Sequence, residues 1–122
     1  MAISIAYIPK GATSEQKKIL IERTKEACMK GLGLGYKHSF VYLQEVDPEC
    51  MDETAVDMKC LFVFTTLGKT PEGKNEVCRR FDEACAEAFG ENKGRTIVIF
   101  KEHGDDNAGS NGYLRPFVPN TK

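Results

Sequence analysis

Two stretches of the chain are copies of one another: residues 11–28, GATSEQKKILIERTKEAC, and residues 68–85, GKTPEGKNEVCRRFDEAC. A shift of 57 positions aligns them without a gap, and over residues 1–45 the same shift gives 12 identities, where ordinary composition gives about three. The identities fall at a turn glycine, at a helix-capping threonine, along one helix face and in a strand. Such a repeat indicates one supersecondary unit used twice.

Each copy has the pattern of a strand, a helix and a second strand. In the first copy, alternating apolar residues over 3–7 predict a half-buried strand. A capping box at Thr13 and Gln16 begins a helix that we expect to run over about residues 14–30, and residues 39–45 are expected to form the next strand. Three glycines are expected to end the helix: Gly31, Gly33 and Gly35.

The second copy has the same order and clearer signals. Residues 60–66 are almost entirely apolar or β-branched, which is typical of a strand covered on both faces. Thr70 and Pro71 form a helix cap followed by proline at the first helical position, Gly90 ends the helix, and residues 96–101 form the last strand. The helix stripe expected to face the sheet is Val77, Phe81, Ala84 and Ala88, with a weaker equivalent in the first helix at Leu20, Thr24, Ala27 and Gly31.

Together these elements predict an α/β fold. Two tandem βαβ units, about residues 1–57 and 58–112, should form one four-stranded sheet with both helices on one face. At 122 residues the chain is expected to be one domain whose repeats share a core, followed by a C-terminal tail over residues 113–122. The other face of the sheet carries apolar residues that include Ile3, Ile5, Tyr7 and the run 61–64. Because nothing else in the chain covers that face, we expect a homo-oligomer.

Composition and charge exclude several classes of protein. The chain has 41% hydrophobic and 29% charged residues and a formal net charge of -1. It is therefore typical of a globular protein and lacks the positive charge expected of a nucleic-acid partner. It has no apolar run long enough to span a bilayer and no signal-peptide pattern at its start, so we expect no membrane partner and a cytoplasmic location.

Neither the cysteines nor the loop after the last strand has the pattern of a metal or disulfide site. The five cysteines form no CxxC pair, which argues against disulfides or zinc and favours buried thiols: Cys28, Cys50, Cys60, Cys78 and Cys85. Residues 103–112 are rich in turn-forming residues but lack the spacing of an EF-hand, so a turn or hairpin is predicted. His103 near Asp105 and Asp106 is a weak metal signal, and we expect neither a metal nor another cofactor.

The first strand and helix start resemble the tautomerase superfamily, whose simplest member is 4-oxalocrotonate tautomerase. The resemblance is carried by residues 3–18, ISIAYIPKGATSEQKK, by the spacing of the strand ending at Glu45 and by the glycine-containing run 104–112. It covers about residues 1–112. It implies a fold like that of macrophage migration inhibitory factor, a small enol or α-keto acid as ligand, no cofactor, and assembly as a homotrimer.

The resemblance also maps the family's catalytic group onto this chain. Family members use an amino-terminal proline to move a proton between carbon and oxygen. The matching positions are Ala2 and Lys59, so the proline is absent from both copies. If Met1 were removed, Ala2 would expose an α-amine whose unperturbed pKa is about 8. Lys59 could act as a base if buried, but a solvated lysine at a strand start is the simpler interpretation.

Substrate-binding positions follow from the same resemblance. A family arginine after the first-strand glycine, which holds a substrate carboxylate, maps to Ala12 and Lys69. A second arginine, on the second strand, maps to Phe40 and Ile97. Lys69 alone keeps the positive charge, and as a point charge it lacks the forked geometry of arginine. The simpler interpretation of Lys69 is a solvated residue before a helix cap.

Three hypotheses follow. The first is an enzyme that moves a proton on a small enol or α-keto acid with a group other than proline, and so has weak or altered activity. The second is a catalytically silent homologue that binds a small ligand or a partner protein. The third is a ferredoxin-like domain that binds a small metabolite, since two βαβ units also describe that topology. A trimer with strands pairing across subunits would separate the first two from the third, and turnover of an enol such as phenylenolpyruvate would separate the first from the second.

Overall fold

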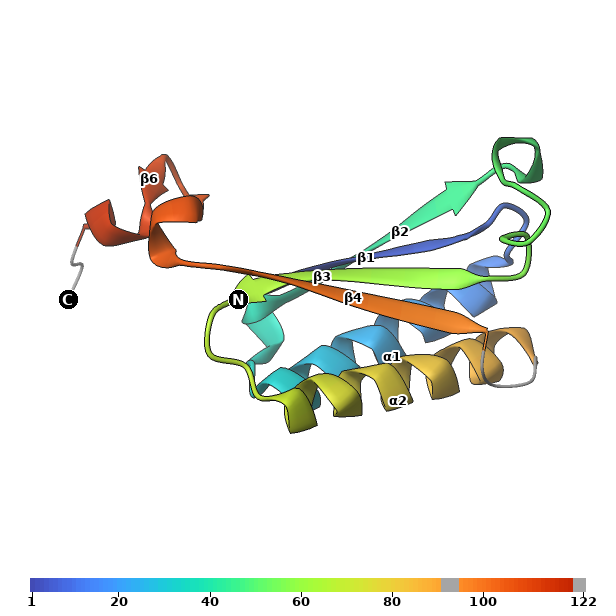
Figure 1. The fold of residues 1–122 in the computed structure, drawn as a ribbon, viewed down its shortest axis with the longest axis horizontal. Coiled ribbons are helices and arrows are strands. Elements are labelled where there is room, and N and C mark those ends of the chain that lie inside the picture. The colour runs from blue at the N-terminus through green and yellow to red at the C-terminus, as the bar shows by residue number, and fades with distance from the viewer. Residues whose placement is uncertain (91–94, 120–122) are drawn as a thin grey trace.

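The computed structural model describes residues 1–90 and 95–119. It has two strand–helix–strand units and a short terminal hairpin (Figure 1). The units are β1 (Ala2–Pro9), α1 (Ser14–Leu32) and β2 (Ser39–Val46), then β3 (Lys59–Thr66), α2 (Pro71–Phe89) and β4 (Thr96–His103). A shift of 57 positions carries the bounds of each element onto its counterpart. The same shift relates two short 3-10 helices, η2 (Pro48–Cys50) and η3 (Asp105–Asn107), so the sequence repeat is also a repeat of structure.

The sheet has the strand order β2-β1-β3-β4. β1 pairs parallel with β2, with Ala2 opposite Ser39, and β3 pairs parallel with β4, with Lys59 opposite Thr96. β1 and β3 meet antiparallel in the middle. The two strands of each unit are therefore neighbours, whereas the split βαβ of ferredoxin-like folds places a strand of the other unit between them. The ferredoxin-like alternative is wrong, and the predicted α/β class with both helices on one face is confirmed (Figure 1).

Both helices begin at the predicted caps. Thr13 Oγ1 accepts a hydrogen bond from the Gln16 amide at 3.1 Å, and Gln16 Oε1 accepts one from the Thr13 amide at 2.8 Å. These two bonds form the predicted capping box. In the second copy, Thr70 Oγ1 accepts a hydrogen bond from the Gly73 amide at 3.0 Å. The caps satisfy backbone groups that would otherwise have no partner in the first helical turn.

Gly31 does not end α1. The helix continues to Leu32 and ends at Gly33, which has a left-handed φ of 67°. Gly31 lies inside the helix, where α1 meets α2. A Cβ atom on Gly31 would lie 2.6 Å from the carbonyl oxygen of Gly73, and a Cβ atom on Gly73 would collide with the carbonyl oxygen of Gly31. Glycine is needed at both positions because the two backbones approach each other so closely.

The core lies between the sheet and the helices. The predicted stripe of α2 is buried throughout, and so are its equivalents in α1 at Leu20, Thr24 and Ala27. Strand side chains alternate between the two faces of the sheet. In β3, Leu61 and Val63 are buried under the helices, whereas Phe62 and Phe64 are exposed on the opposite face. The expectation that this strand is covered on both faces is therefore wrong for the single chain.

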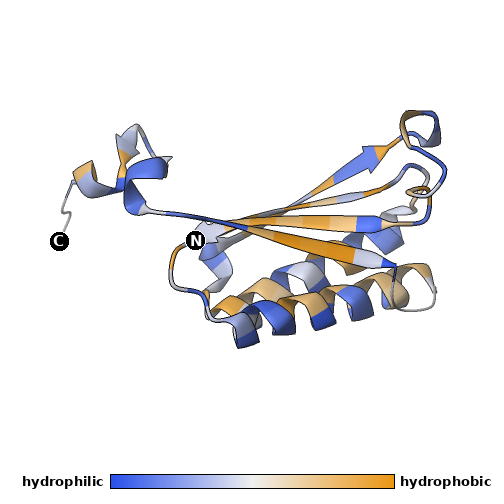
Figure 2. Cartoon of the chain, in the orientation of Figure 1, coloured by the Kyte–Doolittle hydropathy of each residue, from blue (hydrophilic) through white to orange (hydrophobic). Residues whose placement is uncertain are grey.

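The sheet face opposite the helices is apolar and uncovered. We call it the open face. β3 and β4 are hydrophobic along much of their length (Figure 2), and the open face presents exposed residues from all four strands: Tyr7, Phe40, Tyr42, Phe62, Phe64, Ile97 and Ile99. The rings of Tyr7 and Phe62 meet edge to face, with centroids 5.5 Å apart. Contiguous apolar surface of this kind typically marks an interaction site.

Two repeated ion pairs join each helix to the last strand of its own unit. Lys17 Nζ lies 2.8 Å from Glu45 Oε1, and Lys74 Nζ lies 2.7 Å from Glu102 Oε1. Lys17 and Lys74 are equivalent under the 57-residue shift, as are Glu45 and Glu102. These sequence identities therefore correspond to one structural contact made twice.

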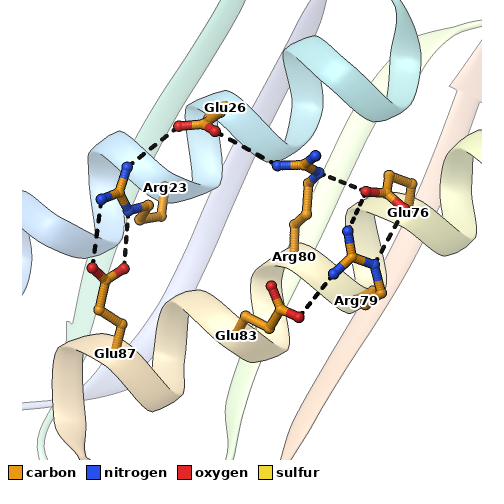
Figure 3. Close-up of polar contacts among 7 residues, drawn as sticks. All are labelled: Arg23, Glu26, Glu76, Arg79, Arg80, Glu83 and Glu87. Atoms are coloured by element: carbon orange, nitrogen blue, oxygen red, sulfur yellow. Dashed lines mark hydrogen bonds and ion pairs between the residues drawn. The ribbon is translucent and has the colours of Figure 1, made fainter.

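A chain of ion pairs crosses the outer faces of the helices (Figure 3). Arg23 of α1 contacts Glu87 of α2, with Nε and Oε2 2.9 Å apart, and Arg80 of α2 reaches Glu26 of α1, with Nη1 and Oε1 3.5 Å apart. Hydrogen bonds from Arg79 and Arg80 lower the pKa of Glu76 to about 2. Exposed pairs of this kind contribute little to stability.

The segment after β4 is a turn and a hairpin, as predicted. It consists of η3, a hairpin of β5 (Gly109–Ser110) and β6 (Tyr113–Leu114), and η4 (Arg115–Phe117). Asn111 and Gly112 at the hairpin turn have φ of 52° and 89°, which suits the twist of paired strands. The segment projects beyond the end of the sheet (Figure 1). Residues 120–122 of the expected tail lie outside the described residues.

The cysteines match the expectation of buried thiols only in part. Cys28 and Cys85 are buried, Cys60 and Cys78 are half-buried, and Cys50 is exposed. Burial raises the pKa of the Cys28 thiol. In the part of the chain that the structure describes, none of the helices combines the length and apolar character that crossing a bilayer requires.

Candidate functional site

The residues expected to act lie at opposite ends of the sheet. Ala2 begins β1 beside Thr65, near the end of β3. Lys59 begins β3 at the other end, near the end of β1, where Cys60 is opposite Tyr7. Equivalent positions of the two units are separated in this way because β1 and β3 run antiparallel. The fold thus has two candidate sites, which we call the amino-terminal site and the Lys59 site.

At the amino-terminal site, the Met1 α-amine lies near two cations. Burial lowers the pKa of this amine below its usual value of 8.0, and the charges of Lys69 and Arg115 lower it further. Thr65 Oγ1 donates a hydrogen bond to the Met1 carbonyl at 3.0 Å. Ala2 is buried, and its nitrogen is an amide while Met1 precedes it. The basic group at this site is therefore the Met1 amine, and Ala2 supplies none.

Sequence reasoning missed Arg115. The resemblance directs attention to the loop after the first strand and to the second strand, whereas Arg115 begins η4 in the tail. Its amide donates a hydrogen bond to the Ala108 carbonyl at 2.9 Å, which ties η4 to the start of the hairpin. A tail arginine carries no motif, and only the three-dimensional path of the hairpin brings its charge near the amino terminus.

Lys59 is buried, with 2% of its surface exposed. The expectation of a solvated lysine at a strand start is wrong, because the alternation of β3 directs this first residue toward the helices. Lys59 Nζ donates a hydrogen bond to the Asp57 carbonyl at 3.3 Å. The same atom lies 4.8 Å from the centre of the Phe89 ring at the end of α2, a distance at which the ring attracts a cation.

Lys59 lines a hollow of about 350 Å³ between the β1–α1 loop, the β2–β3 loop and the end of α2. The wall is formed by Pro9, Lys10, Gly11, Ala12, Gln16, Val56, Asp57, Lys59 and Phe89. Gly11 has a φ of 111°, a conformation that favours glycine, and so allows the sharp turn at the rim. The volume lies in the lower part of the range for small-molecule sites.

The charges around this hollow favour an anionic ligand. Lys10 and Lys59 supply two positive side chains. The Asp57 carboxylate accepts a hydrogen bond from Arg95, which lowers the pKa of that carboxyl. Because Asp57 is already paired with a guanidinium, its negative charge opposes an incoming anion only weakly. A small carboxylic acid with an apolar part matches both the charge and the wall.

The other expected binding residues lie apart from this hollow. Lys69 is half-buried in the loop before α2 and belongs to the amino-terminal site. Phe40 and Ile97 are second in β2 and β4, opposite Ile3 and Cys60. Their side chains are exposed on the open face, whereas Ala2 and Lys59 face the helices. Across residues 1–90 and 95–119, no group of three or more His, Cys, Asp or Glu side chains is placed to hold a metal.

Comparison with known proteins places this geometry in a fold family. No protein-family model matches the sequence, and no curated protein matches it either. Among solved structures, native fused 4-OT shares 18% identity over 95% of this chain and 98% of that chain, with a TM-score of 0.85. Pt0534 inactivated by 2-oxo-3-pentynoate shares 19% over 96% and 99%, with a TM-score of 0.84. Malonate semialdehyde decarboxylase shares 18% over 91% and 92%, with a TM-score of 0.77.

Identities this low establish the fold and nothing finer. The chain therefore has the fold of the tautomerase superfamily, in the form with two βαβ units in one chain.

Proposed function

We propose that this chain is a member of the tautomerase superfamily that binds small enol or α-keto acids, with Lys59 as proton-transfer group in place of the missing proline. One observation carries the proposal. The position in the second unit that matches the family's proline holds a buried amine, and that amine lines a hollow of about 350 Å³.

The wall of the hollow suits the proposed chemistry. A bound α-keto acid would place its carboxylate near Lys10, while Val56 and Phe89 would contact its apolar part. After Lys59 releases a proton to solvent, its amine would take a proton from the carbon next to the carbonyl and return it to oxygen, or the reverse. The negative charge of the enolate would be stabilised by the ammonium formed on Lys59, which acts more strongly in a water-poor site than in bulk water.

The names of two structural neighbours support the ligand class. One was solved after inactivation by 2-oxo-3-pentynoate, which is an α-keto acid. Another is a malonate semialdehyde decarboxylase, whose name specifies a small acid with a carbonyl group. These neighbours share the fold at low identity, so they support the chemical class of ligand by analogy.

The amino-terminal site is expected to contribute weakly. Its α-amine has a lowered pKa and two nearby cations, Lys69 and Arg115, which suit a carboxylate. A proline is absent there, and Ala2 offers only an amide nitrogen while Met1 is present. We therefore expect low activity overall. A catalytically silent homologue that binds the same acids is the alternative.

The proposal includes a homotrimer in which further copies cover the open face. Burying its seven exposed aromatic and aliphatic side chains provides the driving force. Fused 4-OT proteins with this fold were solved as symmetric and asymmetric trimers.

The test compares turnover of phenylenolpyruvate, followed by absorbance, in two variants. Lys59→Met keeps the length of the side chain and removes the amine. We expect it to lower turnover by 10²-fold or more, about the contribution of a placed general base. Lys18→Met, at an exposed position of α1, is the matched control and should retain the wild-type rate. Equal rates in all three proteins would refute the role of Lys59. Binding of pyruvate without turnover in the wild type, seen by NMR titration, would favour the silent homologue.

A further inference from the structure

We infer that Lys59 is a nucleophile that forms an imine with small aldehydes and α-keto acids in the Lys59 hollow. The inference rests on the proposed function in placing such an acid there. It goes further by assigning to the amine a covalent bond to carbon rather than proton transfer alone.

Burial is the first argument. Imine-forming lysines are typically desolvated, because the neutral amine attacks the carbonyl and because bulk water would hydrolyse the product. Lys59 is 2% exposed, although it lines a hollow large enough for a small acid. Its side chain is therefore shielded from bulk solvent and forms part of the wall that a ligand in the hollow would meet.

The surroundings of Nζ are the second argument. The Asp57 carbonyl accepts a hydrogen bond from Nζ at 3.3 Å and orients it. The Phe89 ring centre lies 4.8 Å from Nζ, so the ring that stabilises the ammonium would equally stabilise a protonated imine at the same place. Lys10 on the same wall would attract the carboxylate of an α-keto acid and hold its carbonyl carbon toward Lys59.

The step is balanced without any further reagent. The neutral amine, having released one proton to solvent, attacks the carbonyl carbon and forms the carbon–nitrogen bond. The carbonyl oxygen takes up a proton, and the resulting carbinolamine loses that oxygen as one molecule of water. The product is an imine, which becomes a cation on protonation. Both hydrogens of the neutral primary amine leave with the carbonyl oxygen as water, the nitrogen stays in the imine, and nothing is oxidised or reduced.

The experiment traps the imine in the full-length chain. The protein is incubated with pyruvate, reduced with sodium borohydride, and analysed by intact mass and peptide mapping. We expect one reduced pyruvate adduct, located on Lys59 and formed at least 10-fold faster than any adduct on Lys18. Lys59→Arg keeps the positive charge but cannot form the imine, and it should lose the adduct. Lys18→Met should keep it.

Three results would overturn the inference: no adduct, adducts spread over exposed lysines with Lys59 unmodified, or an adduct confined to the Met1 amine. NMR titration with pyruvate and the phenylenolpyruvate assay, both without borohydride, separate this failure from failure of the proposed function. Binding and turnover that depend on Lys59, without an adduct, would leave the proton-transfer role in place and remove the covalent one. Because trapping is mapped on the wild-type protein, the result does not depend on whether a variant folds.

Discussion

Gly31 of α1 packs against Gly73 of α2 so closely that a Cβ atom on Gly31 would lie 2.6 Å from the Gly73 carbonyl oxygen. We expect Gly31→Ala to destabilise the protein by about 1–3 kcal/mol, because the added methyl group forces the helices apart, although alanine is the better helix former. The free energy of unfolding in urea measures the effect.

Gly35→Ala is the matched control for this prediction. A Cβ atom on Gly35 would have its nearest contact at 3.8 Å, so the change should be within about 0.5 kcal/mol. A Gly31→Ala variant as stable as the wild type would show that the helices do not meet at this point.

Phe81→Ala should be among the most destabilising single changes. Phe81 is buried in the middle of the α2 stripe, and removing a buried ring costs about 3–5 kcal/mol. Phe117→Ala removes the same ring from an exposed position and should have little effect in the same urea titration. A cost below about 1 kcal/mol for Phe81→Ala would mean that this face of α2 is not in the core.

The ion pairs of Glu76 should make stability depend on acid pH. The pKa of Glu76 is lowered to about 2 by hydrogen bonds from Arg79 and Arg80, so between about pH 2 and pH 4.5 the folded state binds fewer protons at this carboxyl than the unfolded state. Its contribution is fully present above about pH 4.5 and is lost as the pH falls toward 2. The difference in unfolding free energy between wild type and Glu76→Gln should shrink over that interval and shrink further in high salt. A difference that does not change with pH would contradict this.

Phe64→Lys should weaken the proposed trimer. Phe64 is exposed on the open face, and an ammonium buried there against other copies would lack a partner. Sedimentation velocity should show a shift from trimer to monomer at concentrations where the wild type is assembled. Ile21→Lys, on the outer surface of α1, should remain trimeric. A wild-type chain that is monomeric when dilute and stable would refute the trimer.

Placing proline at the amino terminus should raise activity. A chain that carries Ala2→Pro and begins at that proline would present a secondary amine at the start of β1, where proline is tolerated, next to the charge of Lys69. We expect a gain in phenylenolpyruvate turnover toward the 10²–10⁴-fold that a placed general base provides. The same substitution with Met1 retained should give no gain, because the nitrogen is then an amide. Mass spectrometry of the amino terminus verifies which species is assayed.

The fold could be predicted from the sequence because local signals agreed with each other. Thr13 and Thr70 marked equivalent helix starts, and the Phe81 stripe had a clear helical period. Gly31 was misinterpreted because glycine usually signals a helix end, and a close contact with another helix leaves no local pattern. Gly31 is needed because of its contact with Gly73, which lies 42 positions away in the sequence.

The candidate site was less predictable because it too depends on contacts between residues far apart in the sequence. The repeat pointed to Lys59, but the hollow that Lys59 lines is formed with Phe89 and with the loop at Gly11, which belong to different units. Arg115 was missed because its charge reaches the amino terminus through the path of the terminal hairpin. Strand alternation could have shown that Phe40 and Lys59 face opposite sides of the sheet, since both positions were assigned to strands.

The glycine contact between the helices occurs once, although the structural unit occurs twice. Under the 57-residue shift, Gly31 corresponds to Ala88 and Gly73 corresponds to Gln16. A chain joined from two first halves would set Gly31 against Gln16, and one joined from two second halves would set Ala88 against Gly73. Neither could bring its helices as close as the natural pair. The halves have thus diverged into non-interchangeable partners, each shaped to complement the other and no longer suited to pair with a copy of itself.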